Sequence, residues 1–122
     1  MSALILAIDD EADILDVVRT TLEGAGFEVH VASSPRDGLK FYDEHWRDIN
    51  LVLLDFLMPE MTGDLVFESM QRVNPDVRVI LLTAYEDNVA RKMFAEGLRG
   101  YIQKPFYTDD LIQRVRDEIE AV

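Results

Sequence analysis

The chain has 122 residues, which is enough for one domain with a real hydrophobic core and too few for two. Its 24 acidic and 12 basic side chains give a net charge of -12, which argues against direct nucleic-acid binding because the phosphate backbone would be repelled. Cysteine is absent, so disulfides, zinc–thiolate sites and a cysteine nucleophile are all excluded.

The first apolar run, residues 3–8, is broken at once by Asp9, Asp10 and Glu11. This run is too short to span a membrane, and no basic segment precedes it as in a signal peptide. We therefore expect a cytoplasmic protein that makes no membrane contact.

The first third of the chain predicts two strands and two helices. Residues 4–8 form an apolar run typical of a buried strand, and a helix with apolar residues at helical spacing follows until a glycine-containing turn ends it. Residues 27–32 alternate apolar and polar positions, as a half-exposed edge strand does. Ser34 and Pro35 predict the N-cap and first position of a helix that runs to about Trp46.

The middle of the chain predicts the central strand. Residues 51–54 are four consecutive apolar residues, which indicates a strand buried on both faces, and Asp55 closes the run. The next helix is expected to start near Gly63 and to stop before Pro75. A further apolar strand is expected over residues 77–82.

The last part of the chain predicts a helix over residues 87–96 and a short strand over residues 98–102. Lys104 and Pro105 then break the chain. A final helix carries apolar residues at helical spacing, namely Leu111, Ile112, Val115 and Ile119.

The alternation of strand and helix predicts an α/β fold with a doubly wound parallel sheet and helices on both faces. The first, third and fourth strands are apolar on both faces and belong in the middle of the sheet. The second alternates, and the fifth is interrupted by Arg99 and Gly100, so both belong at the edges. A flavodoxin-like order 2-1-3-4-5 with five helices satisfies this pattern. Residues 1–122 are then one domain, with no output domain after the last helix.

Polar side chains follow the predicted buried strands: Asp9 and Asp10 the first, Asp55 the third, Thr83 the fourth and Lys104 the fifth. Because the carboxyl ends of parallel strands meet at one rim of the sheet, these side chains are expected to gather there. Two carboxylates ~4 Å apart repel each other by about 4 kcal/mol at an effective dielectric constant of about 20. A cation would relieve this repulsion, and an all-oxygen set of ligands suits Mg²⁺.

These strand-end residues and their neighbours resemble the receiver domains of two-component response regulators, the CheY-like family. The resemblance covers nearly the whole chain and rests on four motifs: Asp9-Asp10, Asp55, Thr83-Ala84 and Lys104-Pro105-Phe106. It implies a signalling switch that catalyses only its own phosphorylation and dephosphorylation, rather than an enzyme for an external substrate.

The resemblance also implies a role for each site residue. Asp55 would be the phosphoacceptor, whose carboxylate attacks phosphorus to give an acyl phosphate. Mg²⁺ would be held directly by Asp10, Asp55 and the backbone carbonyl of Leu57, with Asp9 acting through water. Lys104 would pair with a phosphoryl oxygen as a point charge.

The same resemblance implies a switch and a set of partners. Thr83 would move inward on phosphorylation and Tyr101 would rotate with it, and the Lys104-Pro105 peptide would be cis. The phosphoryl donor would be a sensor histidine kinase or a phosphotransfer protein. The face formed by the last two helices and the fifth strand would then act on a second copy, a downstream effector or an output domain.

Each of these assignments has an ordinary structural competitor. Asp9 and Asp10 suit the first turn of a helix, where carboxylates favour the helix dipole. Thr83 could cap the helix that follows it, Lys104 could be a solvated loop residue, and Tyr101 could be ordinary edge-strand packing.

Three other functional classes remain as alternatives. A phosphatase of the haloacid dehalogenase type would need a second aspartate where the chain has Leu57. A flavin or nucleotide binder would need a neutral, Gly- or Ser/Thr-rich phosphate loop where the chain has Asp9, Asp10 and Glu11. A degenerate receiver that only binds protein would lack part of the site, and no site residue is missing.

Two residues depart from common receiver patterns. Leu57, two residues after Asp55, is apolar, and Tyr85, two residues after Thr83, is bulky. Both are expected to restrict the attacking water and so to lengthen the life of the acyl phosphate.

Overall fold

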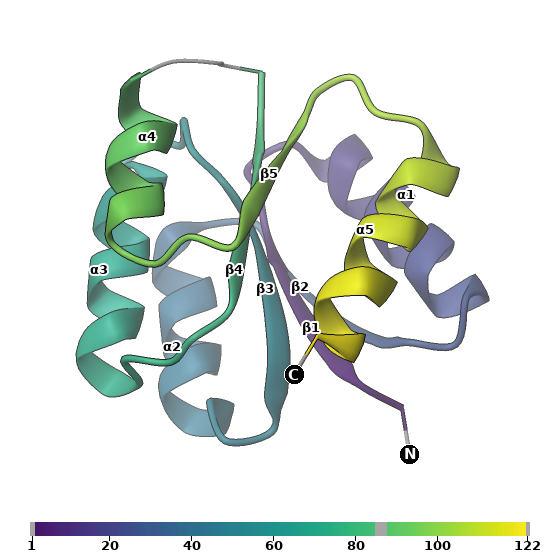
Figure 1. Cartoon of the computed structure of the whole chain (residues 1–122), viewed down its shortest axis with the longest axis horizontal. Coiled ribbons are helices and arrows are strands. Elements are labelled where there is room, and N and C mark those ends of the chain that lie inside the picture. The colour runs from purple at the N-terminus through teal and green to yellow at the C-terminus, as the bar shows by residue number, and fades with distance from the viewer. Residues whose placement is uncertain (1, 85–87, 122) are drawn as a thin grey trace.

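Strand and helix alternate five times along residues 2–84 and 88–121, which the computed structural model describes (Figure 1). The strands are β1 (Leu4–Ile8), β2 (Glu28–Ala32), β3 (Ile49–Asp55), β4 (Val79–Thr83) and β5 (Gly100–Gln103). The helices are α1 (Ala12–Gly24), α2 (Pro35–His45), α3 (Gly63–Val73), α4 (Asn88–Ala95) and α5 (Thr108–Glu120). The predicted class and element order are therefore confirmed.

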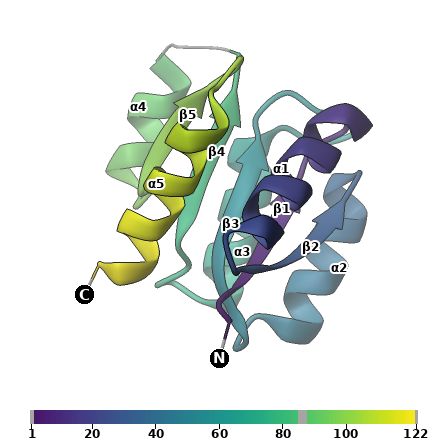
Figure 2. The same ribbon diagram turned by 90° about the vertical axis from the view of Figure 1, so that its right-hand side faces the viewer.

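The five strands form one parallel sheet in the order β2-β1-β3-β4-β5, which confirms the predicted topology. Helices α1 and α5 cover one face of the sheet, and α2, α3 and α4 cover the other (Figures 1 and 2). The central strands are buried on both faces, and every residue of β4 is buried. The alternating strand β2 lies at one edge, as its pattern predicts, and keeps Glu28 and His30 exposed.

A hydrophobic core lies on each side of the sheet. On the α2–α3–α4 side the largest fully buried side chains include Tyr42, Phe67 and Met70. On the α1–α5 side the buried residues include Leu22 and Leu111. Within the described ranges, no helix is long and apolar enough to cross a bilayer.

Local hydrogen bonds explain where elements begin. Ser34 caps α2 by accepting a hydrogen bond from the Asp37 N–H at 3.1 Å, which confirms the predicted start of this helix. Strands β4 and β5 begin two residues later than the sequence predicts. The residues just before each strand belong to the turn that follows the preceding helix. The Val77 N–H donates to the carbonyl of Asn74 after α3, and the Leu98 N–H donates to the carbonyl of Met93 in α4. Apolar pattern alone does not separate such turns from strand.

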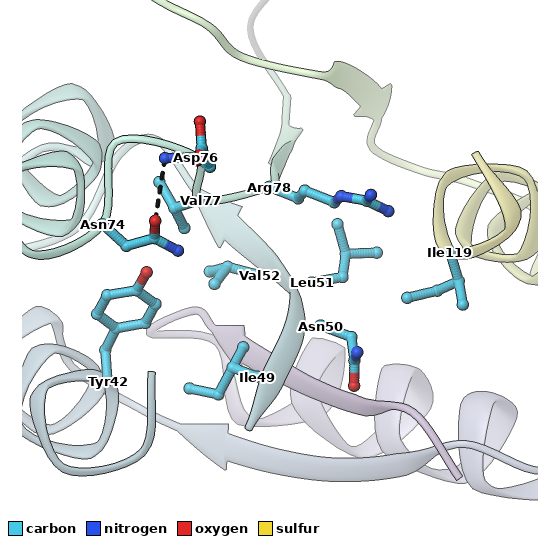
Figure 3. Close-up of a pocket in the computed structure, with 10 residues that line it drawn as sticks. All are labelled: Tyr42, Ile49, Asn50, Leu51, Val52, Asn74, Asp76, Val77, Arg78 and Ile119. Carbon is cyan, nitrogen blue, oxygen red and sulfur yellow. Dashed lines mark hydrogen bonds between the residues drawn. The ribbon is translucent and has the colours of Figure 1, made fainter. Parts of the chain in front are cut away.

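A hollow of about 320 Å³ lies at the amino ends of β3 and β4, away from the carboxyl ends of the strands (Figure 3). Tyr42 is 1% exposed there, and its hydroxyl points toward the side-chain amide of Asn74. In the described part of the chain this hydroxyl has no hydrogen bond of acceptable geometry. Burial raises the pKa of Tyr42, while the nearby Asn74 acts to lower it.

The substitution Tyr42→Phe is expected to leave the free energy of unfolding unchanged or to raise it by about 1 kcal/mol, because it removes a buried hydroxyl without a good partner and keeps the packed ring. Urea denaturation of both proteins checks this. A loss above about 2 kcal/mol would mean that the hydroxyl makes a strong bond in solution, because a buried group left unsatisfied costs about that much.

Candidate functional site

Three carboxylates meet at the carboxyl ends of β1 and β3. Asp55 is the last residue of β3 and is 5% exposed, Asp9 follows β1 and is 1% exposed, and Asp10 is exposed. One carboxylate oxygen from each residue lies within 4.8 Å of those of the other two. The structure therefore brings together the three acidic residues that the sequence predicts at one rim.

Lys104 reaches this cluster from the loop after β5. Its Nζ lies 2.7 Å from Asp9 Oδ2, 3.4 Å from Asp55 Oδ1 and 3.9 Å from Glu11 Oε2. Burial acts to lower the pKa of Lys104, but the hydrogen bond to Asp9 and the charges of Asp55, Asp9 and Glu11 outweigh it, so that the pKa is raised. The ammonium is therefore a fixed positive charge within the site, and the solvated-loop alternative for this lysine is wrong.

Asp9 combines a structural and an electrostatic role. Its Oδ1 accepts a hydrogen bond from the Glu11 N–H at 2.9 Å, at the N-cap of α1, and its Oδ2 pairs with Lys104. Both oxygens of Asp9 thus already have a donor. The alternative that Asp9 or Asp10 caps the first helix is wrong, because Glu11 is the N-cap of α1, no described side chain makes a capping hydrogen bond there, and the acidic residue of the first turn is Asp13.

Asp55 is held in an unfavourable environment for a negative charge. Burial raises its pKa from 3.8 to about 7, and the charges of Asp9 and Asp10 act in the same direction. The charge and hydrogen bond of Lys104 oppose this shift without cancelling it. A carboxyl group whose pKa is raised by burial and by like charges is a common property of a functional site.

Thr83 and Tyr101 occupy the two strands beyond Asp55. Thr83 ends β4, is 1% exposed, and its carbonyl accepts a hydrogen bond from the Lys104 N–H at 2.8 Å. Tyr101 lies in the edge strand β5, is half-buried, and packs edge-on against Phe94 at a ring-centroid distance of 6.4 Å. The Lys104-Pro105 peptide is cis, as the family resemblance implies. Tyr85 lies outside the described residues.

The loop between β3 and α3 holds Asp55 through tight backbone contacts that the sequence analysis did not identify. Glu60 has φ of 74°, and the Met61 N–H bonds to the Pro59 carbonyl at 2.9 Å, which makes a classic γ-turn, a strained conformation. A Cβ on Gly63 would lie 2.7 Å from the carbonyl oxygen of Asp55, so this position requires glycine. Gly63 was predicted only as a helix start.

Leu57 lies in the same loop and is 52% exposed. Like Gly63, Glu11 belongs to the site although the sequence analysis did not predict it there. The available signal was the run of three acidic residues, Asp9, Asp10 and Glu11, at the carboxyl end of the buried strand β1.

Comparison with known proteins assigns this site to a family. The sequence profile of the response regulator receiver domain matches the chain over residues 5–116. The chain belongs to the response regulator receiver domain family. It is therefore a phosphoryl-accepting domain of two-component signalling, and a signalling switch rather than an enzyme in the usual sense. The phosphatase and flavin-binding alternatives are set aside on this finding.

Three relatives illustrate the likeness of this receiver domain to known proteins. The sensor kinase CckA of Brucella abortus is 32% identical over 124 residues, which cover 98% of this chain and 13% of that protein, so the chain spans only a small part of that relative. A response regulator receiver domain from Clostridium thermocellum is 35% identical, with a TM-score of 0.91 and coverage of 96% of this chain and 94% of that one. The response regulator TrrA of Thermotoga maritima, solved with Mg²⁺ and beryllium fluoride, is 28% identical, with a TM-score of 0.84 and coverage of 95% and 98%.

Proposed function

We propose that Asp55 of this receiver domain accepts a phosphoryl group from the phosphohistidine of a sensor histidine kinase or a phosphotransfer protein. The observation that carries the proposal is the position of Asp55, which is nearly buried at a strand end, beside two other carboxylates and 3.4 Å from the Lys104 ammonium. Asp9 shares these neighbours, but its two oxygens already accept hydrogen bonds from the Glu11 N–H and from the Lys104 ammonium.

The donor set fits Mg²⁺, the ion held by the Thermotoga relative. Carboxylate oxygens from Asp9, Asp10 and Asp55 come within 4.8 Å of one another, and hard oxygen ligands are those that Mg²⁺ prefers. Asp10, Asp55 and the backbone carbonyl of Leu57 would hold the ion directly. Asp9 would act through water, because Lys104 and the Glu11 N–H already occupy its two oxygens. Bound Mg²⁺ would neutralise charge at the transferring phosphoryl group.

The chain's own residues supply the positioning for the transfer. An oxygen of Asp55 forms the bond to phosphorus as the phosphorus–nitrogen bond of phosphohistidine breaks, and the bonding electron pair leaves with the imidazole nitrogen. Lys104 pairs with a phosphoryl oxygen and so offsets the repulsion between the negative phosphoryl group and the Asp55 carboxylate. Burial of Asp55 keeps competing water away from the reacting carboxylate.

The output of the switch is the face formed by α4, β5 and α5. Thr83 lies on β4, between Asp55 and this face, and Tyr101 lies on β5 within the face; the two strands are hydrogen-bonded neighbours. A phosphoryl group on Asp55 would draw the Thr83 hydroxyl inward and let Tyr101 rotate. This would shift a two-state equilibrium of the face toward binding a downstream effector or a second copy of the chain.

The direct test is phosphorylation by acetyl phosphate with Mg²⁺, followed by intact mass and peptide mapping. The account expects one added phosphoryl group, located on Asp55, and none in Asp55→Asn. A phosphoryl group on another residue, or equal labelling of Asp55→Asn, would overturn the proposal. Turnover of external phosphoesters would instead favour a phosphatase.

The exposed Leu57 is expected to protect the acyl phosphate. The substitution Leu57→Asn offers a polar side chain to the attacking water and should speed loss of phosphate about tenfold, which corresponds to roughly 1.4 kcal/mol of barrier. The decay of phosphoprotein, followed by intact mass, measures this. Val73→Asn on α3 is the control, because Val73 is also a partly exposed apolar residue but lies at the other end of that helix. Decay as fast in wild type as in Leu57→Asn would contradict the prediction.

A further inference from the structure

Three carboxylates face the Lys104 ammonium in the described part of the chain, and they differ sharply in exposure. The side chains of Asp9 and Asp55 are 1% and 7% exposed, whereas that of Glu11 is 60% exposed. Lys104 itself is 10% exposed. Among these three, Glu11 is therefore the solvent-exposed carboxylate beside this ammonium.

The backbone of Glu11 is held by hydrogen bonds, whereas its side chain is exposed. Its N–H donates to Asp9, and its carbonyl accepts hydrogen bonds from the N–H groups of Ile14 and Leu15 at the start of α1. Its side chain makes no capping hydrogen bond to the helix. The carboxylate is thus not needed to hold the helix end, and its described interaction is the 3.9 Å approach to Lys104.

We propose that Glu11 is a specificity-determining residue for the phosphodonor: its exposed carboxylate covers the charge of Lys104 and disfavours donors that arrive as small, highly charged anions. Donors with less negative charge on the phosphoryl group, or with cationic groups around it, are disfavoured less. This inference rests on the proposed role of Asp55, because it concerns which donor reaches that residue.

Several exposed groups on this rim have the same sign of charge as Glu11, although Arg36 in the first turn of α2 is basic. Asp13 lies in the first turn of α1, and Asp109 and Asp110 lie in the first turn of α5, all exposed and all at the end of the sheet where the site lies. Among these acidic groups, the recorded ion pair with Lys104 belongs to Glu11. A phosphodonor therefore approaches a mostly acidic rim on which Glu11 is the exposed carboxylate nearest to Lys104.

Two small phosphodonors, acetyl phosphate and phosphoramidate, differ in net charge and in the bond that breaks. With acetyl phosphate, the Asp55–phosphorus bond forms as the phosphorus–oxygen bond breaks and acetate leaves with the electron pair. With phosphoramidate, the phosphorus–nitrogen bond breaks instead, and ammonia leaves with the proton that its nitrogen already carries. Near neutral pH the first donor is a dianion, while the second carries one net negative charge because its nitrogen is protonated.

The experiment compares second-order rate constants for phosphorylation of Asp55 by both donors, at Mg²⁺ concentrations shown by calorimetry to saturate each protein. Glu11→Gln should speed the reaction with acetyl phosphate about fourfold to tenfold and that with phosphoramidate about twofold to threefold, because the interaction energy scales with donor charge and the rate factor for the monoanion is the square root of that for the dianion. The increase should appear in the rate constant at low donor concentration, and the limiting rate at saturating donor should stay the same. Glu11→Asp should keep most of the wild-type discrimination.

The matched control is Asp13→Asn, which removes an exposed charge from the same helical turn but has no recorded ion pair with Lys104. It should change the ratio of the two rate constants less than twofold. In the wild type, added salt should raise the rate with acetyl phosphate more than that with phosphoramidate, and Glu11→Gln should reduce this difference.

Equal gains with both donors in Glu11→Gln, or an equal effect of Asp13→Asn, would overturn the inference. So would a wild-type preference between the donors that does not respond to salt. Absence of phosphorylation at Asp55 in the wild type with either donor would instead contradict the proposed function itself. The wild-type salt series gives an answer even if a variant folds poorly.

Discussion

Replacing Asp55 by asparagine is expected to stabilise the metal-free domain at about pH 8 by on the order of 2–4 kcal/mol. The folded protein raises the pKa of Asp55 from 3.8 to about 7, mainly by burial and then by the charge of Asp9. Each unit of pKa shift corresponds to ~1.4 kcal/mol of free-energy difference between the two protonation states. The expected stabilisation is set below the full value of the shift, because solvent reaches one side of the site and screens the charge. An asparagine carries no charge to bury.

The sign of this effect fixes its dependence on pH. Between about pH 4 and pH 7 the unfolded chain has lost the Asp55 proton while the folded chain retains it, so the folded state binds more protons and stability falls as pH rises. Below this window Asp55 is protonated in both states, and the advantage of Asp55→Asn should vanish. Above it, the advantage should be constant.

Urea denaturation of wild type and Asp55→Asn from about pH 4 to pH 8, without divalent cations, measures this difference. Asp9→Asn is the contrast, because Asp9 holds Lys104 and the Glu11 N–H, and its loss should stabilise less or destabilise. Mg²⁺ should raise the Tm of wild type more than that of Asp55→Asn, since a ligand at 100 times its Kd adds about 2.7 kcal/mol. A gain that does not depend on pH would contradict the electrostatic origin.

The opposite charge change is expected to have the opposite effect. The substitution Lys104→Met keeps the length of the side chain but removes the ammonium that touches Asp9 and Asp55. Breaking a buried ion pair on one side typically costs about 3–5 kcal/mol, and the partial exposure of this site lowers the expected loss to about 2–3 kcal/mol. Phosphorylation at Asp55 should also slow strongly.

A double-mutant cycle with Asp55→Asn isolates this electrostatic cost. The double variant should recover much of the stability lost in Lys104→Met, because one of the two carboxylates left without the ammonium is then neutral. Arg72→Met on α3 is the control, since Arg72 forms an exposed pair with Glu68 and should cost under about 1 kcal/mol. Additive effects of the two site substitutions would show that the charges do not interact.

Most of the fold could be predicted from the sequence because the relevant signals are local. The apolar runs of the central strands, the alternation in β2 and the Ser34-Pro35 start of α2 each depend on residues close in the chain, and each was confirmed. Strand ends were less predictable. Asp55 belongs to β3 because it pairs with Leu82 across the sheet, and no pattern within residues 51–54 reveals that pairing.

The gathering of the site residues was predictable for a different reason. Parallel strands carry their carboxyl ends to one rim, so the topology alone brings Asp9, Asp10 and Asp55 together. The pairings within the site were not predictable. The Lys104 ammonium is bound more closely by Asp9 than by Asp55, across 95 positions of the chain, and this depends on side-chain conformations that topology does not determine.

The same limit applies to contacts away from the site. Glu118 is a buried carboxylate on α5 that pairs with Arg99 just before β5, and its carbonyl accepts a hydrogen bond from Arg78. In the sequence, Glu118 has the spacing of an apolar core position and Arg99 only interrupts a strand. A buried carboxylate that forms an ion pair with an arginine far away in the sequence cannot be recognised from local periodicity.

The proposed function of this receiver domain requires one Mg²⁺ ion and one phosphoryl group to share the acidic cluster of Asp9, Asp10 and Asp55. A crystal structure with Mg²⁺ and beryllium fluoride tests this in a single experiment. We expect beryllium bonded to a carboxylate oxygen of Asp55, Mg²⁺ about 2.1 Å from oxygens of Asp10 and Asp55, and the Lys104 ammonium on a fluorine. Beryllium fluoride on another residue, or Mg²⁺ bound away from both of these carboxylates, would contradict the account.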